Sequence, residues 1–348
     1  MRQPDLSFIA VTYRSAARAA LALHSLRSEV EKEGLGAEII LVDHSESEFE
    51  AGALTALNPD RLVVQPNRGY AAGLNAGIEL ACGETLLLAN PDIEFLPGSL
   101  APLLGALDAG AAIAGPQFIL GSFLFPPAEV QRPREEFRRL WRQRSAGALR
   151  RSVSRSAAHW AATWRANEPL EVEALSGALL ALRGTTARRL GPWDEGYFLY
   201  FEEMEWQRRA RRQGLPLWLV PRARIRHTWG HAADPAANSE HFLRSRRRFY
   251  LSSFPMWGRL VLGLPASKAS WAWPSLPEAL PRLRRGVWLV SPSPAGLPAA
   301  GALDLTTEEV RHELTSFAHQ RSHGGALTVA AWEPATGTLH GPWCWQGA

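Results

Sequence analysis

Short apolar runs alternate with segments of helical periodicity through the first third of this 348-residue chain. Strands that alternate with helices pair as parallel neighbours, because each crossover connection carries the chain back to the same end of the sheet. The pattern therefore predicts an α/β fold with a mostly parallel central sheet flanked by helices. The apolar runs are Ser7–Thr12, Glu38–Val42, Leu62–Gln65, Thr85–Ala89 and Ala111–Gly115, and the helices include Ala19–Val30, Ala71–Ala81 and one from about Ser99.

Composition favours one large globular domain with a smaller appendage, since 46% of the residues are hydrophobic and 21% are charged. Two cysteines, Cys82 and Cys344, are too few for a disulfide framework. The first apolar run starts almost at Met1 without the core of a signal peptide, and no stretch of about 18 apolar residues follows. We therefore expect a cytoplasmic protein, with peripheral contact on the inner face of a membrane as the further option.

Positive charge is concentrated in Arg132–Arg155, where nine arginines face two glutamates. This pattern is compatible with a solvated surface segment or with a surface for anionic lipids or an anionic acceptor. No nucleic-acid-binding motif accompanies the arginines, so we predict no nucleic-acid partner.

Periodicity fades over residues 118–169, which we interpret as an Arg-rich excursion or lid within a catalytic domain spanning residues 1–235. Residues 236–285 are expected to form a helical extension rich in basic and aromatic residues, and 286–348 a small C-terminal segment of unassigned role. The later elements predicted are Glu173–Leu182, a helix at Glu202–Gln213, a strand at Leu217–Val220, and helices at Asn238–Trp257 and Glu308–Phe317, with a strand at Leu327–Trp332.

Polar residues follow three of the predicted strands: Thr12 and Tyr13, then Asp43, then Asn90 and Asp92. In parallel α/β sheets ligands bind beyond the carboxyl ends of the strands, so these positions should converge. Asp43 could accept hydrogen bonds from a base or ribose, or it could act with Ser45 as a turn cap.

The motifs of several classes of nucleotide-binding protein are absent from this sequence. The first strand-to-helix turn reads Tyr13-Arg14-Ser15 without the glycines of a dinucleotide site, and no Walker-type phosphate loop occurs. A nucleotidyltransferase would need a Gly-rich basic loop after the first strand, and none is present.

Taken together, the motifs resemble those of glycosyltransferase family 2, which has the GT-A fold. Val11-Thr12-Tyr13, Val42-Asp43, the run from Asn67 to Asn75 and Leu88-Ala89-Asn90-Pro91-Asp92 are similar to its successive donor-site motifs. The run from Trp193 to Glu205 and Ile225-Arg226-His227 resemble the acceptor-side and histidine motifs of its rhamnosyl- and galactofuranosyltransferase-like branch.

The resemblance implies a donor site and a divalent metal, Mg²⁺ or Mn²⁺. Thr12, Tyr13 and Asp43 would hold the nucleobase and ribose, and Asp92 would stand for the last acid of the family's Asp-x-Asp, whose first acid is replaced by Asn90. His227 would complete the metal sphere, although a lone histidine is more often a surface or core residue. The further donor-binding candidates are Asn67, Gly69, Gly73 and Asn75.

An inverting transferase needs a carboxylate that accepts the proton of the acceptor hydroxyl. Glu203 aligns with the family's aspartate and is the predicted base, with Glu202 beside it as the second catalytic candidate. The alternative is that the acids of this segment only favour the helix N-terminus. Gly177 would let backbone approach the acceptor, or would mark a strand bulge, and Trp193 and Tyr197 would form an aromatic platform for a sugar, or belong to the core.

We therefore expect an inverting glycosyltransferase that moves a sugar from a nucleoside-diphosphate sugar, such as dTDP-rhamnose or a UDP-sugar, to a cell-surface glycan or a lipid-linked acceptor. The acceptor and donor classes rest on the resemblance alone. The alternative is a non-catalytic nucleotide-sugar or glycan-binding module on the same fold.

Overall fold

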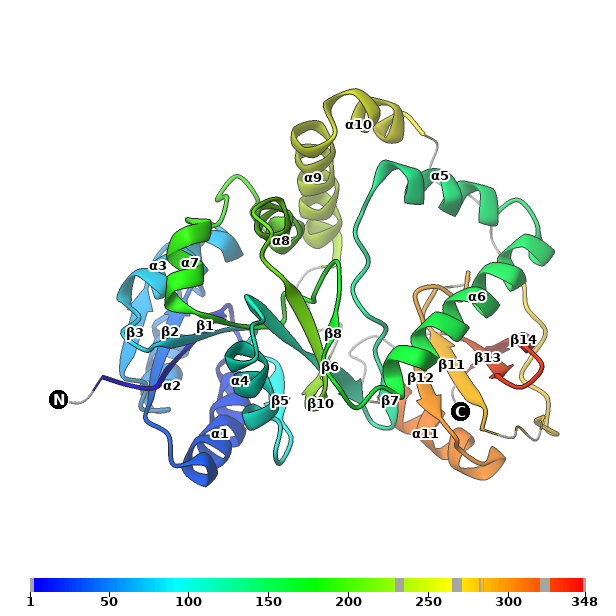
Figure 1. The fold of residues 1–348 in the computed structure, drawn as a ribbon, viewed down its shortest axis with the longest axis horizontal. Helices are drawn as coiled ribbons and strands as arrows, with labels where there is room; N and C mark the ends of the chain where they lie inside the picture. Colours follow the sequence, from blue (N-terminus) through cyan, green and yellow to red (C-terminus); the bar gives the residue numbers. More distant parts are fainter. Residues whose placement is uncertain are drawn as a thin grey trace.

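The computed structural model describes residues 3–228, 235–264, 271–281, 283, 285–293, 295–319 and 326–346. One large twisted sheet runs through the molecule, with helices on both faces (Figure 1). Its strand order is β14-β13-β11-β12-β7-β6-β9-β4-β1-β2-β3, and β10 pairs with β5, β6 and β8 beside this path.

The N-terminal half of the sheet is parallel. It consists of β1 (Leu6–Thr12), β2 (Ala37–Asp43), β3 (Arg61–Val64) and β4 (Thr85–Ala89), with β1 between β2 and β4. All seven residues of β1 are buried, as is typical of a central strand covered on both faces. The four strands predicted over these residues are confirmed, and their parallel pairing places the ends of β1, β2 and β4 at one edge.

One strand of this region runs the opposite way. β9 (Leu179–Arg183) lies antiparallel between β4 and β6 (Ile113–Leu120), and β10 (Leu217–His227) pairs parallel with β6. The sheet is therefore more mixed than the sequence predicts. Because β9 is reversed, residues at its start lie beside residues at the end of β4.

Helices cover the two faces of the sheet and create two cores. α1 (Ala16–Glu33) and α4 (Leu100–Asp108) pack on one face, while α3 (Tyr70–Leu80), α7 (Gly184–Leu190) and α8 (Glu202–Arg212) pack on the other. A short α2 (Glu48–Thr55), which the sequence analysis did not identify, contacts α1 and β3. Alternate residues of β1 enter opposite cores, because successive side chains of a strand point to opposite faces.

The predicted excursion at 118–169 is folded and packs on the C-terminal region. It holds β7 (Phe123–Leu124), α5 (Pro133–Arg142) and α6 (Ala146–Trp164), and β8 (Leu170–Glu171) follows it. The buried face of α6 includes Val153, Trp160 and Trp164. These side chains pack with residues of β11, of β13 and of the segment just before β12. Arginines alternate with the buried residues along the sequence of α6. This mixture weakens the apolar periodicity that indicates a helix.

The C-terminal residues extend the main sheet. β11 (Val287–Ser291), β12 (Ala300–Leu303), β13 (Leu327–Glu333) and β14 (Thr338–Trp345) are antiparallel, and β12 joins β7 through Gly301 and Leu124. α11 (Thr307–His319) packs on the face opposite α6. The predicted helix at 308–317 and strand at 327–332 are both confirmed.

Two predicted elements differ in extent. The strand expected to stop before Pro221 continues to His227, with a register shift against β6 between Val220 and Arg224 that accommodates the proline. The helix expected at 238–257 is divided into α9 (Pro235–Ser253) and α10 (Pro255–Leu262), because proline is favoured at the first turn of a new helix. β5 (Ile93–Phe95) pairs with the end of β10.

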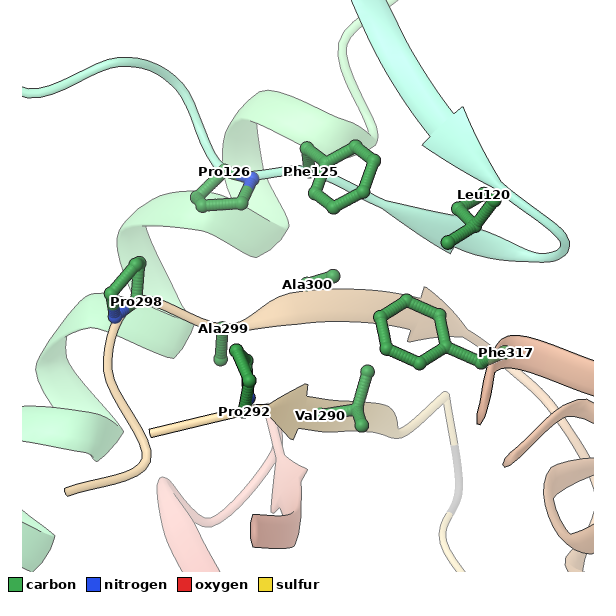
Figure 2. Close-up of a pocket in the computed structure, with 9 residues that line it drawn as sticks. All are labelled: Leu120, Phe125, Pro126, Val290, Pro292, Pro298, Ala299, Ala300 and Phe317. Carbon is green, nitrogen blue, oxygen red and sulfur yellow. The ribbon is translucent and has the colours of Figure 1, made fainter. Parts of the chain in front are cut away.

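An apolar pocket lies between the β6–β7 hairpin and the C-terminal strands (Figure 2). Phe125 and Phe317 line it from opposite sides, and Ala300 from β12. None of the predicted site residues borders it. No helix of the described residues is both long enough and apolar enough to span a bilayer.

The contact of α6 with β12 can be tested at Gly301. A Cβ atom there would collide with the indole of Trp164, whose Nε1 donates to the Phe125 carbonyl at 3.0 Å. Gly301→Ala should lower the free energy of unfolding by about 1–3 kcal/mol, the usual cost of overpacking a core. The measurement is urea denaturation followed by circular dichroism.

Gly105→Ala in α4 is the matched control, because no atom lies within 4 Å of the new methyl group. It should be neutral or stabilise by up to about 1 kcal/mol, as glycine weakens a helix interior. Equal effects of the two substitutions would contradict the tight packing of α6 on β12.

Candidate functional site

The ends of β1 and β2 hold Asp43 in a polar network. The Thr12 hydroxyl donates to Asp43 Oδ1 at 3.2 Å, and the Ser45 backbone N–H donates to the same oxygen at 3.1 Å. The Ser45 hydroxyl also donates to it, so the turn-cap role considered for Asp43 and Ser45 is present. Asp43 Oδ2, by contrast, is buried and has no partner. One oxygen thus fixes the turn, and the other remains able to accept a ligand donor.

Tyr13, the residue after Thr12, is exposed. Its ring lies 5.3 Å from the guanidinium carbon of Arg14, measured to the ring centroid. Arg14 has a positive φ of 49°, which turns the chain away from the strand. An exposed aromatic ring beside buried Asp43 is suited to stacking on a planar base.

The loop before α3 brings the N-terminal motifs against the later ones. Asn67 Oδ1 accepts from the Gly69 N–H at 3.0 Å, and the Tyr70 N–H donates to the Phe198 carbonyl at 2.8 Å. Gly69 has φ 96°, and a Cβ atom there would collide with Phe198. Glycine is therefore required at 69 both for its backbone conformation and for this close approach.

Gly73 and Asn75 support the same junction from within α3. A Cβ atom at Gly73 would lie 2.6 Å from a methyl of Val11. Asn75 donates to the Trp193 carbonyl at 3.0 Å and accepts from the Trp193 N–H at 2.8 Å. These contacts are structural, and a direct donor contact by Asn67, Gly69, Gly73 or Asn75 remains a prediction.

Asp92 and His227 come together at the end of β4. Asp92 Oδ1 lies 3.4 Å from His227 Nε2, because His227 at the end of β10 pairs with Ile93 of β5. Burial alone would raise the pKa of Asp92, but a hydrogen bond from His227 and its charge, with smaller contributions from the backbone and Arg18, lower that pKa overall. Asp92 is thus held ionised beside an imidazole.

This pair fits a divalent ion in its chemistry. A carboxylate oxygen and an imidazole nitrogen are both ligands of Mn²⁺, and Mg²⁺ is often held by few protein ligands together with substrate phosphates. Within the described residues, no group of three or more His, Cys, Asp or Glu side chains could hold a metal. The remaining ligands would have to come from a bound diphosphate or water.

Two acidic side chains stand at the start of α8. Glu202 is buried, and burial together with the charge of Glu203 raises the pKa of Glu202 well above its usual value. Burial also raises the pKa of Glu203, whereas hydrogen bonds from backbone N–H groups at the helix start act to lower it. A Cβ atom at Gly177 would lie 3.0 Å from the Cβ atom of Glu203, so Gly177 leaves room for this side chain.

The segment that precedes β9 connects Glu203 to the residues after β4. The Asn90 N–H donates to the Ala178 carbonyl at 2.9 Å, and Gly177 precedes Ala178 against Glu203. Gln207 holds α8 in place, because its amide accepts from the Leu175 N–H at 2.7 Å and donates to the Leu175 carbonyl at 2.9 Å. The sequence analysis did not identify Gln207, since a glutamine in a polar helix gives no sign of its partner.

Glu205 has a different role. It pairs with Arg209 at 3.0 Å, one turn further along α8.

Tyr200 and Phe201, just before the helix, both have left-handed φ values, 70° and 69°. Two such non-glycine residues in succession are costly, and strain of this kind is concentrated at functional sites.

The aromatic platform predicted from Trp193 and Tyr197 is not open in this structure. Trp193 is only 2% exposed and stacks on Trp206 with ring centroids 4.6 Å apart, and Tyr197 is 0% exposed. Tyr197 packs instead with Phe201 and Phe249. We assign both side chains to the support of the loop that precedes α8.

Tyr70 is a site residue that the sequence analysis missed. Its hydroxyl is buried without a hydrogen-bond partner, and burial with the charges of Glu202, Glu203 and Asp92 raises its pKa well above the usual value. The hydroxyl is therefore close to the acids of α8 and to Asp92. A tyrosine in the first turn of α3 was visible in the sequence, but nothing there indicated where its hydroxyl would lie.

A family model matches part of the chain: residues 7–165 match Glycosyl transferase family 2. Two curated relatives, from two strains of Mycobacterium tuberculosis, are each an N-acetylglucosaminyl-diphospho-decaprenol L-rhamnosyltransferase. Each is 27% identical over 281 residues, which cover 74% of this chain and 87% of the relative.

Two solved structures are also similar, each at 17% identity. GalNAc-T7 with UDP, GalNAc and Mn²⁺ aligns over 65% of this chain and 44% of its own, with a TM-score of 0.47. The mannosyltransferase PcManGT from Pyrobaculum calidifontis, in complex with GDP-Man and Mn²⁺, aligns over 72% of this chain and 63% of its own, with a TM-score of 0.46. This chain thus spans less than two thirds of each structure.

The unpartnered Tyr70 hydroxyl predicts an effect on stability. Tyr70→Phe removes a buried polar group that has no partner, so the free energy of unfolding should stay the same or rise by up to about 1–3 kcal/mol. Urea denaturation of the ligand-free protein is the measurement. A clear loss of stability would show that the hydroxyl is hydrogen-bonded in the folded protein.

Proposed function

We propose that this enzyme, a glycosyltransferase that carries a family 2 domain on the GT-A fold, transfers a sugar from a nucleoside-diphosphate sugar to an acceptor hydroxyl with inversion at the anomeric carbon. The observation that carries the proposal is that the buried Tyr70 hydroxyl is close enough to both Asp92 and the acids of α8 for their charges to raise its pKa. Asp92 lies beside His227, and Glu202 and Glu203 stand at the start of α8.

The donor nucleotide would bind at the ends of β1 and β2. The unpartnered Asp43 Oδ2 can accept the imide hydrogen of uracil or thymine, and Tyr13 can stack on the base. A guanine presents a different set of donors and acceptors, so pyrimidine nucleotides are the expected donors. The rhamnosyltransferase relatives favour an activated L-rhamnose as the sugar.

Asp92 and His227 would hold a divalent ion at the diphosphate. The ion would supply positive charge for the diphosphate as it leaves. Asn90 contributes a neutral amide where a second acid would add charge, so the protein's own hold on the metal is modest. Metal binding should therefore depend strongly on the donor.

Glu203 would act as the general base. As the acceptor oxygen attacks the anomeric carbon, its proton passes to the Glu203 carboxylate, and the bond to the diphosphate breaks with the electron pair leaving on the diphosphate. Burial and the charge of Glu203 raise the pKa of Glu202 well above its usual value, whereas backbone N–H groups limit the rise for Glu203, which favours Glu203 as the member of the pair that ionises first.

The acceptor would approach from the side of Gly177, where the absence of a side chain lets the backbone pack closely against Glu203. The curated relatives are named for transfer to N-acetylglucosaminyl-diphospho-decaprenol. We propose the same broad class here, a lipid-linked sugar or the glycan built on it.

The acid pair predicts a specific pattern of kinetics. Glu203→Gln should lower kcat by about a hundred- to ten-thousand-fold, as loss of a positioned base does, while nucleotide affinity stays within a few-fold. Because burial raises the pKa of Glu203 and the base must be ionised, the wild-type rate should rise with pH through a pKa above the ordinary glutamate range.

Glu202→Gln is the matched control for that prediction. It keeps the shape of the side chain at the neighbouring acid, which is not the proposed base, so kcat should change by no more than a few-fold and an acidic limb should remain in the pH profile. Collapse of activity in Glu202→Gln with a functional Glu203→Gln would reassign the base to Glu202.

The donor site predicts linkage between nucleotide and metal. UDP or dTDP with Mn²⁺ should raise the melting temperature more than GDP with Mn²⁺, since a ligand that binds only the folded state stabilises it. Asp92→Asn should abolish the Mn²⁺-dependent part of the shift and retain a metal-independent part. Equal shifts with GDP and UDP would contradict the role of Asp43, and an unchanged Mn²⁺ response in Asp92→Asn would contradict the metal site.

A further inference from the structure

α10 turns apolar side chains outward. Met256 and Trp257 are 72% and 53% exposed, and Leu260 lies one turn further on and is also exposed. The opposite face is packed, because Val261 is buried and a Cβ atom at Gly258 would collide with the backbone of Tyr250 in α9. The helix is therefore fixed with its apolar face away from the protein, the reverse of an ordinary surface helix.

α5 continues this surface. It contacts α10, and Figure 1 shows the two helices at the same side of the molecule, with α1 on the opposite side. Phe137 and Trp141 of α5 are exposed. Isolated exposed apolar residues need no explanation, but five on two adjoining helices form a patch of the kind that marks an interaction site.

α5, α10 and the adjoining α9 carry an excess of positive charge. Residues 132–144 hold six arginines and two glutamates, and α9 with α10 holds five arginines and one glutamate, whereas the whole chain is only +4. Arg144 lies 4.9 Å from the ring centroid of Trp141, and Arg259 is exposed on α10. Large apolar side chains bordered by arginines are typical of helices that lie in the interface of an anionic bilayer.

The patch is rigidly joined to the acid-bearing segment. The Arg246 guanidinium and the Tyr250 hydroxyl of α9 both contact Glu136 of α5. Toward the site, Arg248 pairs with Asp194 at 2.9 Å, and the Ser245 hydroxyl donates to the Leu199 carbonyl at 2.8 Å. A surface that contacted α5 and α10 would therefore also be held near the loop that leads into α8.

We propose that Phe137, Trp141, Met256, Trp257 and Leu260, with the surrounding arginines, form a docking face for an anionic membrane surface. The aromatic and aliphatic side chains insert among the acyl chains, and the arginines contact the acidic headgroups. This binding is separate from sugar transfer, because it needs neither donor nor acceptor. It would place the enzyme with the Asp194–Phe201 side of its site toward the bilayer.

Vesicle flotation tests the proposal with the full chain and no substrate. The wild type should bind vesicles that contain phosphatidylglycerol, bind pure phosphatidylcholine vesicles more weakly, and lose affinity as salt is raised. Trp257→Ser with Leu260→Ser should weaken binding at least about tenfold, since burying one large apolar side chain is worth about 1.5–3 kcal/mol. Arg144→Gln with Arg259→Gln should reduce only the preference for anionic vesicles.

Phe49→Ser is the matched control, because Phe49 is 82% exposed on α2, away from the patch. It should bind vesicles as the wild type does, and all variants should keep the wild-type melting temperature. Equal flotation of wild type and the Trp257/Leu260 variant would overturn the proposal. A wild-type dimer in sedimentation velocity that becomes a monomer in that variant would also overturn it, by assigning the patch to a second copy of the chain.

Discussion

Two adjacent carboxyl groups stand at the start of α8, Glu202 buried and Glu203 half-buried, and the surrounding structure offsets the cost of placing them there. Burying a carboxylate is expensive unless it is protonated or hydrogen-bonded. Burial and the charge of Glu203 favour the protonated form of Glu202, while backbone N–H groups favour the charge on Glu203. Gln207 ties the helix to Leu175 by two hydrogen bonds, and Gly177 leaves the space that Glu203 fills. The position of one acid thus depends on contacts along the whole first half of the helix.

The candidate site extends beyond the segment that matches the family model. Residues 7–165 include Asp43 and Asp92, whereas Glu203 and His227 lie further along the chain. The glutamate at 203, where the family carries aspartate, is accommodated locally, since its side chain packs against Gly177.

Elements that are buried on one or both faces show a regular apolar periodicity, and these were predicted from the sequence. Elements in which buried residues alternate with charged ones were missed. β1 to β4 were clear because nearly every residue of β1, β2 and β4 is apolar and buried. α6 was not, because its buried tryptophans alternate with arginines, and the direction of β9 depends on partners distant in sequence. For the site, the family resemblance proposed Asp92, His227 and Glu203 as candidates, but the burial of Trp193 and the location of the Tyr70 hydroxyl depend on packing that no local pattern records.

The reversed strand β9 has an evolutionary consequence. In a wholly parallel sheet, every loop at the ligand edge follows a strand, so changing one loop alters the connection into the next helix. Because β9 runs the other way, the residues at its start reach that edge from a loop that precedes the strand and comes from the α5–α6 region. The two parts of the candidate site are thus carried by separate segments of the chain, so a change in the loop before β9 can leave the strand ends of β1, β2 and β4 as they are.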